Sequence, residues 1–264
     1  MTKVVLSIAG SDPSGGAGIQ ADLKTLHAHG VYGLTVPTLI TVQNTLGVQA
    51  VHPLPAELVQ HQIQVLLDDF EVEAIKIGAL GNRAIIEAVH EVLQALNVPV
   101  VLDPVLVSTS GKSLLEDAAI SALQKWLFPL CTLITPNLPE LQVLYRGKVP
   151  TEGNFLVKGG HGNGTVLTDT LWMAGERVVE FHAERQSTRN LHGTGCTLSS
   201  SIAAHLTSGF SLPEAVRQAH AYLQGAIRHA PDLGQGSGGL NHFWQQNGAA
   251  FAEMDSSLCS GQSH

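Results

Sequence analysis

The chain has 264 residues, of which 44% are hydrophobic and 14% charged, and its formal net charge at pH 7 is −8. This acidic balance, with only three Trp and three Tyr residues, argues against a nucleic-acid surface, and the lack of any run of about eighteen apolar residues argues against a membrane span. No basic flank and cleavage site precede the first apolar run. We therefore expect a cytoplasmic protein with a small-molecule partner and a core of its own.

The cysteines and histidines show neither disulfide nor zinc spacing. Cys131, Cys196 and Cys259 are scattered, without a C-x-x-C pair, and are expected to be reduced thiols. The 13 histidines contain no His-Glu-x-x-His motif, so most of them are interpreted as surface or core residues.

Short apolar runs alternate with helical patterns along most of the chain. Several runs are apolar on both faces, as the strands of a buried parallel sheet are, and the alternation predicts repeated βαβ units with right-handed crossovers. Strands are predicted over residues 4–9, 34–42, 74–77, 98–102, 132–135 and 155–158, and helices over 18–29, 56–69, 82–96, 114–128 and 138–145.

The pattern changes over residues 165–182, where two apolar runs flank a short turn and predict a hairpin that closes one edge of the sheet. Two helices are predicted next, over residues 194–207 and 213–228, and from Pro231 the sequence becomes rich in Gly, Gln and Ser. No linker or repeat divides the chain. Residues 1–248 are therefore predicted to form one domain and residues 249–264 a flexible tail.

The first predicted strand runs into a glycine-rich loop. Residues Gly16-Ala17-Gly18-Ile19-Gln20-Ala21 match the Gly-x-Gly-x-x-Gly/Ala pattern of dinucleotide-binding turns. The next strand carries no Asp or Glu that could bind a ribose, which disfavours an NAD site. The loop could equally cradle a small polar substrate at the carboxyl edge of the sheet.

Another strand is followed by a polar loop that contains Gly111-Lys112-Ser113. This tripeptide is not part of a P-loop, because Leu106 stands where that motif requires glycine. Asp103, at the start of the same loop, either faces a site at the carboxyl edge or is an ordinary strand-end aspartate.

Two further strand ends allow a structural and a functional interpretation. Asn137 and Glu140 have the spacing of a capping box at a helix start, whereas a functional role would place Glu140 on a magnesium ion through water, beside nucleotide phosphates. Lys158 and the glycines after it indicate either a flexible entry into the hairpin or a contact to a nucleotide.

The segment Asn190-Leu191-His192-Gly193-Thr194-Gly195-Cys196-Thr197 is the most informative part of the chain. Its two glycines permit a sharp turn, and the helix that follows directs unpaired N–H groups and its positive dipole end at that turn, which favours an anion. If the anion is a transferring phosphoryl group, Cys196 can act on the acceptor hydroxyl, and the local field would favour its thiolate. The alternative is a buried cysteine at an ordinary helix N-terminus. Together with the strand ends, this turn predicts an open α/β enzyme whose site lies at one sheet edge.

In their order, these motifs resemble the hydroxymethylpyrimidine/phosphomethylpyrimidine kinases of thiamine synthesis, a branch of the ribokinase-like superfamily. The resemblance runs from Val4 to about Arg228 and implies a single-domain three-layer α/β sandwich, with a mostly parallel central sheet, helices on both faces and a small β-hairpin at one edge. The motifs are Ala9-Gly10-Ser11-Asp12 with residues 15–25, Val42-Gln43-Asn44-Thr45, Lys76-Ile77-Gly78, Leu102-Asp103-Pro104-Val105, Thr135-Pro136-Asn137-Leu138-Pro139-Glu140, Val157-Lys158-Gly159-Gly160-His161 and residues 192–199.

The resemblance also implies roles for individual residues. Gln43 would bind the aminopyrimidine, since an amide can donate to a ring nitrogen and accept from an exocyclic amine, and Cys196 would take the place of the aspartate base of sugar-kinase relatives. The implied residues are Gly10, Asp12, Ala17, Asp22, Gln43, Ala79 and Val107 for the substrate, Gly193, Thr194, Gly195 and Cys196 for catalysis, Asn137, Lys158 and Gly160 for ATP, and Asp103 and Glu140 for Mg²⁺.

The chain departs from the family pattern at two places. Relatives usually have methionine after the Lys-Ile-Gly motif, whereas this chain has Ala79, which should enlarge the pyrimidine pocket. Relatives usually carry an extra helical stretch before the strand at 155–158, whereas residues 141–154 leave room for only one short helix.

The resemblance implies that a homodimer uses Mg-ATP to phosphorylate 4-amino-5-hydroxymethyl-2-methylpyrimidine and then its monophosphate, for thiamine diphosphate biosynthesis. Pyridoxal or pyridoxine kinase activity is an alternative, because that ring also presents a hydroxymethyl group. A non-catalytic pyrimidine-binding regulatory relative is another, and the intact Gly-Thr-Gly-Cys turn argues against it. A nicotinamide oxidoreductase is disfavoured by the missing ribose acid.

Overall fold

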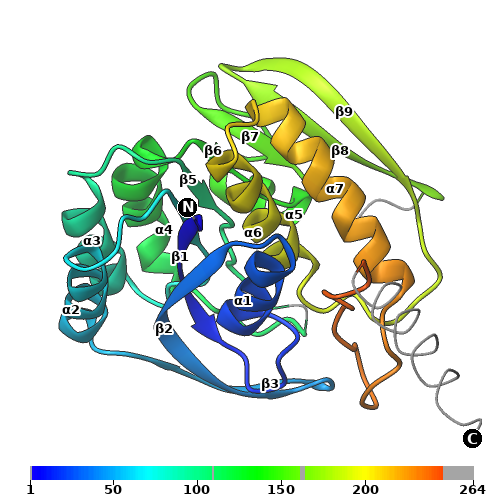
Figure 1. Cartoon of the computed structure of the whole chain (residues 1–264), viewed down its shortest axis with the longest axis horizontal. Coiled ribbons are helices and arrows are strands. Elements are labelled where there is room, and N and C mark those ends of the chain that lie inside the picture. Colours follow the sequence, from blue (N-terminus) through cyan, green and yellow to red (C-terminus); the bar gives the residue numbers. More distant parts are fainter. Residues whose placement is uncertain (1, 109, 161–163, 246–264) are drawn as a thin grey trace, which may run out of the picture.

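The protein is a mixed β-sheet with helices on both faces, and the computed structural model describes residues 2–108, 110–160 and 164–245 (Figure 1). The nine-stranded sheet has the order β3-β2-β1-β4-β5-β6-β7-β8-β9. Its central strands are parallel: β2 (Tyr32–Asn44), β1 (Val4–Ser11), β4 (Ala74–Ile77), β5 (Val100–Leu102), β6 (Leu133–Ile134) and β7 (Asn154–Val157). Antiparallel strands close the two edges, β3 (Gly47–Pro53) at one and the hairpin β8 (Val166–Met173) and β9 (Glu176–Glu184) at the other.

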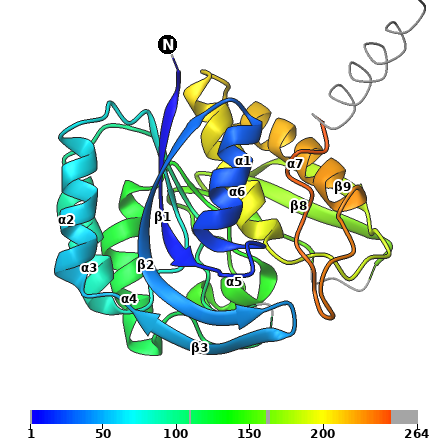
Figure 2. The same ribbon diagram turned by 60° about the horizontal axis from the view of Figure 1, so that its bottom comes forward.

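The helices form the two outer layers (Figures 1 and 2). The helices α1 (Gly18–Ala28), α6 (Thr194–Thr207) and α7 (Leu212–Arg228) cover one face of the sheet. The helices α2 (Ala56–Leu67), α3 (Arg83–Leu93), α4 (Ile120–Ala122) and α5 (Leu138–Tyr145) cover the other. This is the three-layer sandwich that the family resemblance implied, with the hairpin predicted from the sequence pattern at one edge. In the described part of the chain, no helix combines the length and apolarity that crossing a membrane requires.

Hydrophobic patterning explains why these segments form these elements. Strand β1 is apolar on both faces, and Val5, Leu6 and Ile8 are fully buried because helices cover the sheet on both sides. Helix α3 buries one stripe that includes Ile85 and Val89, four residues apart. Asn82, the first residue of the predicted helix, is its N-cap, and its side chain accepts from the Ile85 N–H.

Several predicted elements have the observed bounds, namely β4, α5 and α6. The predicted helix over residues 114–128 is wrong in its first part, because the backbone of Leu114 and Glu116 is hydrogen-bonded to Leu106 and Gly81 instead of to a helical turn. Short turns follow as η1 (Asp117–Ala119), α4, the π-turn η2 (Leu123–Leu127) and η3 (Phe128–Leu130).

The sequence reading missed strand β3, and it ended the preceding strand too early. Strand β2 continues to Asn44, and the chain then turns back through Thr45 and Leu46 so that β3 pairs with its distal half. The short segment between Glu140 and Phe155 is as predicted. It contains only α5, which ends where Arg146 adopts a left-handed conformation with φ of 54°.

A buried ion pair connects the sheet to α1 and α6. The Lys76 ammonium on β4 lies 2.8 Å from both carboxylate oxygens of Asp22 on α1, and neither side chain is exposed. The same carboxylate accepts hydrogen bonds from Ser7 on β1, at 2.6 Å, and from Ser200 on α6, at 2.8 Å. Since four hydrogen bonds saturate the Asp22 carboxylate, the network joins the four elements β1, β4, α1 and α6 at one charged point.

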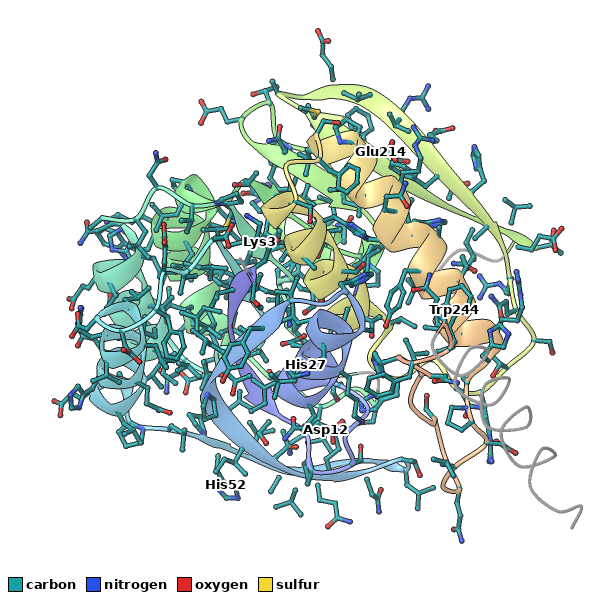
Figure 3. The ribbon with its side chains drawn as sticks, viewed as in Figure 1. Lys3, Asp12, His27, His52, Glu214 and Trp244 are labelled. Carbon is teal, nitrogen blue, oxygen red and sulfur yellow. The ribbon has the colours of Figure 1, made fainter. Side chains whose placement is uncertain are left out.

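We predict that Lys76→Met will lower the free energy of unfolding by about 3–5 kcal/mol, because it leaves the Asp22 carboxylate buried without its cation. Lys3→Met is the matched control, since Lys3 pairs with Glu73 at the surface near the start of β1 (Figure 3) and its side chain is 44% exposed. Its loss should cost less than about 1 kcal/mol. Urea unfolding measures both; equal losses would contradict the role given to the buried pair.

Candidate active site

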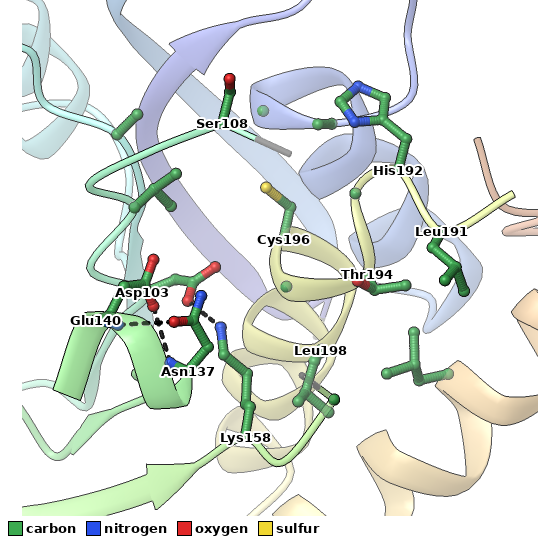
Figure 4. A pocket seen from close by; sticks show the side chains of 18 of the residues that line it. Asp103, Ser108, Asn137, Glu140, Lys158, Leu191, His192, Thr194, Cys196 and Leu198 are labelled. Atoms are coloured by element: carbon green, nitrogen blue, oxygen red, sulfur yellow. Dashed lines mark hydrogen bonds and ion pairs between the residues drawn. The ribbon is translucent and has the colours of Figure 1, made fainter. Parts of the chain in front are cut away.

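A cavity of about 620 Å³ opens at the carboxyl edge of the parallel strands. It collects residues that are far apart in the sequence, from the loop after β1 to helix α7, and Figure 4 shows its centre. All but one of the site residues expected from the sequence line it: Gly10, Asp12, Ala17, Gln43, Ala79, Asp103, Val107, Asn137, Glu140, Lys158, Gly160, Gly193, Thr194, Gly195 and Cys196.

Asp22 is the exception, and the expectation that it walls the substrate pocket is wrong. Its side chain is fully buried and does not line the cavity. Its carboxylate is instead saturated by Lys76, Ser7 and Ser200. Asp22 therefore lies behind the cavity wall and supports the site indirectly, because its ion pair with Lys76 holds α1 and α6 against the sheet.

The N-terminus of α6 points into the cavity as the sequence predicted. Its N-cap, Gly193, has a left-handed φ of 84°, and a Cβ atom built there would lie 1.8 Å from the carbonyl oxygen of Gly16. Only glycine permits this contact between the turn and the first loop. No side chain caps α6 in the described structure. The Thr194 N–H donates to the Leu191 carbonyl and the Thr197 N–H to the Gly193 carbonyl. Among the described contacts, this leaves the Gly195 and Cys196 N–H groups for an anion, as a helix start that binds one requires.

An ion pair lies directly against this helix start. Lys158, just after β7, donates to Asp103, just after β5, at 2.6 Å (Figure 4). Thr135 also donates to Asp103, at 3.0 Å. A Cβ atom at Gly195 would lie 2.7 Å from the Asp103 carboxylate. Burial alone would lower the pKa of Lys158, but Asp103 and Glu140 raise it above the ordinary lysine value, so Lys158 is a cation.

Asn137 and Glu140 form the predicted capping box at the start of α5. The Asn137 side chain accepts from the Glu140 N–H at 2.8 Å, and the Glu140 carboxylate accepts from the Asn137 N–H at 2.9 Å. Both side chains nevertheless line the cavity. Burial raises the pKa of Glu140 to about 7, against the opposing effect of Lys158, while the nearby charge of Asp103 raises it further.

Asp103 and Glu140 are the carboxylates that could hold a metal. Among the described residues, no group of three or more His, Cys, Asp and Glu side chains is arranged as a metal site. Two carboxylates nonetheless fit Mg²⁺, which keeps several waters and is usually bound by one or two carboxylates together with substrate phosphates. The donor set thus suits a magnesium ion that arrives with a nucleotide.

The other end of the cavity holds a cluster that sequence reasoning found only in part. The Asp12 carboxylate accepts from the backbone of Ala17 and from the N–H and hydroxyl of Ser14, and it lies 2.7 Å from His192 Nε2. The same His192 nitrogen lies 3.0 Å from the amide nitrogen of Gln43. Burial alone would raise the pKa of Asp12, but the hydrogen bonds from His192 and Ser14 hold it below the ordinary value.

His192 is a functional candidate to which the sequence analysis assigns no individual role. It lies in the segment 190–197 and directly precedes the Gly-Thr-Gly-Cys turn, but no ligand spacing distinguishes it from the other histidines. In the structure it is buried and lines the cavity. Figure 4 shows Cys196 between His192 and the Asp103–Lys158 pair.

A second group missed from the sequence lines the far side of the cavity. These residues come from the β8–β9 hairpin, from the two residues after it and from α7, and they combine apolar side chains with polar and charged ones. Asp169 on β8 also accepts from the Gly159 N–H at 2.8 Å, which fixes the backbone next to Lys158. The group comprises Leu167, Asp169, Ala183, Glu184, Arg185, Gln186, His220, Leu223, Gln224 and Ile227.

The expectation that the local field favours a Cys196 thiolate is wrong for the ligand-free protein. Burial raises the pKa of Cys196 to about 11; Lys76 lowers it, while Asp22 and Asp103 raise it. The nearest cations are already paired with carboxylates, so they leave little net positive field at the sulfur. The thiol is therefore neutral at pH 7.

We predict that alkylation of Cys196 by iodoacetamide will rise about tenfold per pH unit between pH 7 and pH 10 without levelling off, because only the thiolate reacts. A thiol with the ordinary pKa of 9.0 would approach a plateau within this range. Mass spectrometry of the Cys196 peptide measures the rate, and Cys131, whose pKa burial also raises, is the internal control. A plateau near pH 9 would contradict this assignment.

Comparison with known proteins identifies relatives that cover most of the chain. Residues 12–241 match the family model described as phosphomethylpyrimidine kinase. A curated relative from Rhizobium meliloti (strain 1021), named hydroxymethylpyrimidine/phosphomethylpyrimidine kinase, is 46% identical over 261 residues, which cover 92% of this chain and 98% of the relative.

Two solved structures are similar to this one. The pyridoxal kinase of Staphylococcus aureus in complex with ADP superposes with a TM-score of 0.84 at 32% identity, covering 93% of this chain and 95% of that chain. The phosphomethylpyrimidine kinase of Clostridium difficile 630 superposes with a TM-score of 0.73 at 38% identity, covering 86% of this chain and 100% of that chain.

Proposed function

The chain belongs to the phosphomethylpyrimidine kinase family, and from this premise we propose that it is an ATP-dependent kinase of 4-amino-5-hydroxymethyl-2-methylpyrimidine and of its monophosphate, in thiamine diphosphate biosynthesis. One observation carries the proposal. A single cavity joins an uncapped helix N-terminus with an adjacent lysine to an end that presents the Gln43 amide. The first feature suits transferring phosphates, and the second suits an aminopyrimidine ring.

Gln43 is oriented for ring recognition. Thr41 donates to its amide oxygen at 3.2 Å, and His192 lies at its amide nitrogen. We assign the aminopyrimidine to this end, where the amide would donate to a ring nitrogen and accept from the exocyclic amine. Ala79 also lines the cavity, and its small side chain leaves room beside the ring.

We assign the triphosphate to the start of α6. The Gly195 and Cys196 N–H groups in its first turn and the Lys158 ammonium would bind the terminal phosphates. The side of the cavity between the hairpin and α7, which includes Leu167, Leu223 and Ile227, would take the nucleoside. The ADP complex of the Staphylococcus aureus relative supports a nucleotide in this fold. Asp103 and Glu140 would hold Mg²⁺, which supplies neutralisation of phosphate charge when bound.

Phosphoryl transfer forms a bond between the acceptor oxygen and the γ-phosphorus and breaks the bond to the bridging oxygen, so that ADP leaves. Positioning and charge stabilisation by the helix start and Lys158 would supply most of the acceleration. The first acceptor is an alcohol, whose proton must be removed; the second is a phosphate monoester with a second pKa near 6, which is already largely ionised. We assign the role of base to Cys196. Its thiolate would take the proton of the alcohol, so only the deprotonated form can act.

We predict that Cys196→Ala will slow the first phosphorylation by about a hundredfold and the second by less than about tenfold, since only the alcohol needs a base. Because the thiolate is the minor form below pH 11, wild-type kcat/KM for the alcohol should rise with pH, and the variant should lose this dependence. Single-turnover rates at several pH values measure both. Equal losses for the two acceptors would leave Cys196 a structural thiol.

The proposed function is tested by a phosphoryl-transfer assay with the pyrimidine alcohol, its monophosphate and pyridoxine side by side. We expect turnover of both pyrimidines, with kcat/KM for the alcohol well above that for pyridoxine. The second candidate, pyridoxal or pyridoxine kinase, is favoured by the similarity to the Staphylococcus aureus pyridoxal kinase, solved also with AMP-PCP and pyridoxal. Preference for pyridoxine would select it, and absence of turnover with all three would contradict a kinase.

We further propose that the enzyme is a homodimer, which rests on the family resemblance; sedimentation at micromolar concentration measures this.

A further inference from the structure

The glycine-rich segment after α7, residues 231–242, is ordered against the cavity without lining it. We call this segment the strap. It runs alongside the turn between β2 and β3, and its tip lies next to that turn in both ribbon views (Figures 1 and 2). Nothing in the proposed reaction uses it, so its many contacts need a separate explanation.

The first set of contacts holds Thr45, which lies in the β2–β3 turn two residues after Gln43. The Thr45 hydroxyl accepts from the backbone N–H groups of Gln235 and Gly236, at 3.2 Å and 3.1 Å. The Thr45 carbonyl accepts from the Ser237 N–H at 2.8 Å. A Cβ atom at Gly236 would lie only 2.0 Å from that carbonyl oxygen, so the strap can approach this closely only as glycine.

The second set of contacts holds the segment that leads into the α6 turn. The His192 N–H donates to the Gly238 carbonyl at 3.2 Å, and the Ser237 hydroxyl donates to the Arg189 carbonyl at 3.0 Å. The Arg189 guanidinium donates to Asp232 at 2.7 Å and 2.9 Å. It also donates to carbonyl groups of the strap.

The end of the strap is anchored in the protein interior. His242 is 3% exposed, and its Nε2 lies 3.0 Å from the Thr197 hydroxyl in the first turn of α6. Its carbonyl accepts from the Tyr222 hydroxyl at 2.7 Å. Trp244, labelled in Figure 3, stacks on His229 just beyond, with ring centroids 5.4 Å apart. The strap is therefore fixed at both of its contact regions and at its end.

We infer that the strap is a positioning element for the phosphoryl acceptor, and that its contact with Thr45 in the β2–β3 turn is the most important one. The two regions that it joins carry Gln43 and His192, whose side-chain nitrogens lie 3.0 Å apart across the acceptor end of the cavity. Holding both regions fixes where these two side chains lie at the cavity wall, and thus where the ring would bind beside them. The nucleotide side is built from the start of α6, β7, the hairpin and α7. Thr45 itself contacts only residues 234–237 of the strap, so a change at Thr45 leaves the nucleotide side in place. This inference rests on the proposed function for the identity of the ring.

The test compares Thr45→Val, which removes the hydroxyl acceptor but keeps the shape, with Thr45→Ser, which keeps the hydroxyl. Gln235→Ala is the matched control, because its exposed side chain is removed while its backbone N–H remains. Calorimetry measures the affinities for the pyrimidine alcohol and for ADP. We expect Thr45→Val to weaken the alcohol about tenfold, as the loss of two modest hydrogen bonds allows. ADP affinity should be unchanged, and Thr45→Ser and Gln235→Ala should bind both ligands like the wild type.

Unchanged alcohol affinity, or an equal loss for alcohol and ADP, would overturn the positioning role. A merely structural strap would lower thermal stability alone. Hydrogen exchange of ligand-free protein separates this inference from the proposed function. We expect the peptide containing His192 to exchange faster in Thr45→Val and in Gly236→Ala than in the wild type, which would support the strap. This result would hold even if the wild type did not bind the pyrimidine alcohol, because failure to bind would contradict only the proposed function. Unchanged exchange in both variants would overturn the strap itself.

Discussion

The start of helix α6 is the constraint on which the rest of the site depends. Gly193 can hold its left-handed conformation against the Gly16 carbonyl only because it lacks a side chain, and Gly195 leaves space for the Asp103 carboxylate in the same way. These two contacts fix the helix start between the loop after β1 and the ion pair after β5 and β7. The Gly195 and Cys196 N–H groups of α6 therefore lie at the cavity, where they can donate to an anion.

Support for this helix start comes from outside the cavity. Below it, Lys76 and Asp22 tie α6 to the sheet through Ser200. Beside it, the strap ties Thr197 and the approach to Gly193 to the β2–β3 turn. The residues that would contact substrates are thus held in place by residues that do not line the cavity. Such an arrangement is expected where the rate depends on positioning, because small displacements of reacting groups are costly.

Local sequence patterns predicted most elements of the fold, but they could not predict interactions between residues far apart in the sequence. The bounds of α6 followed from its caps and periodicity, and the turn before it was identified from two glycines alone. Asp22 was misassigned because its partner Lys76 is 54 residues away, and spacing carries no signal for a buried pair. The pKa of Cys196 was misjudged for the same reason, since nearby carboxylates and burial outweigh the helix dipole. Strand β3 pairs with the distal half of β2, which extends to Asn44. The apolar run in the sequence ends at Val42 and did not show this extension.

The most direct test of the central claim is a crystal structure of the protein with AMP-PCP, Mg²⁺ and the pyrimidine alcohol. Our account predicts that the terminal phosphate accepts hydrogen bonds from the backbone N–H groups of Gly195 and Cys196, with Lys158 turned from Asp103 toward the phosphates and the hydroxymethyl oxygen beside Cys196. Phosphates bound instead on the loop after β1, with the start of α6 unused, would contradict it.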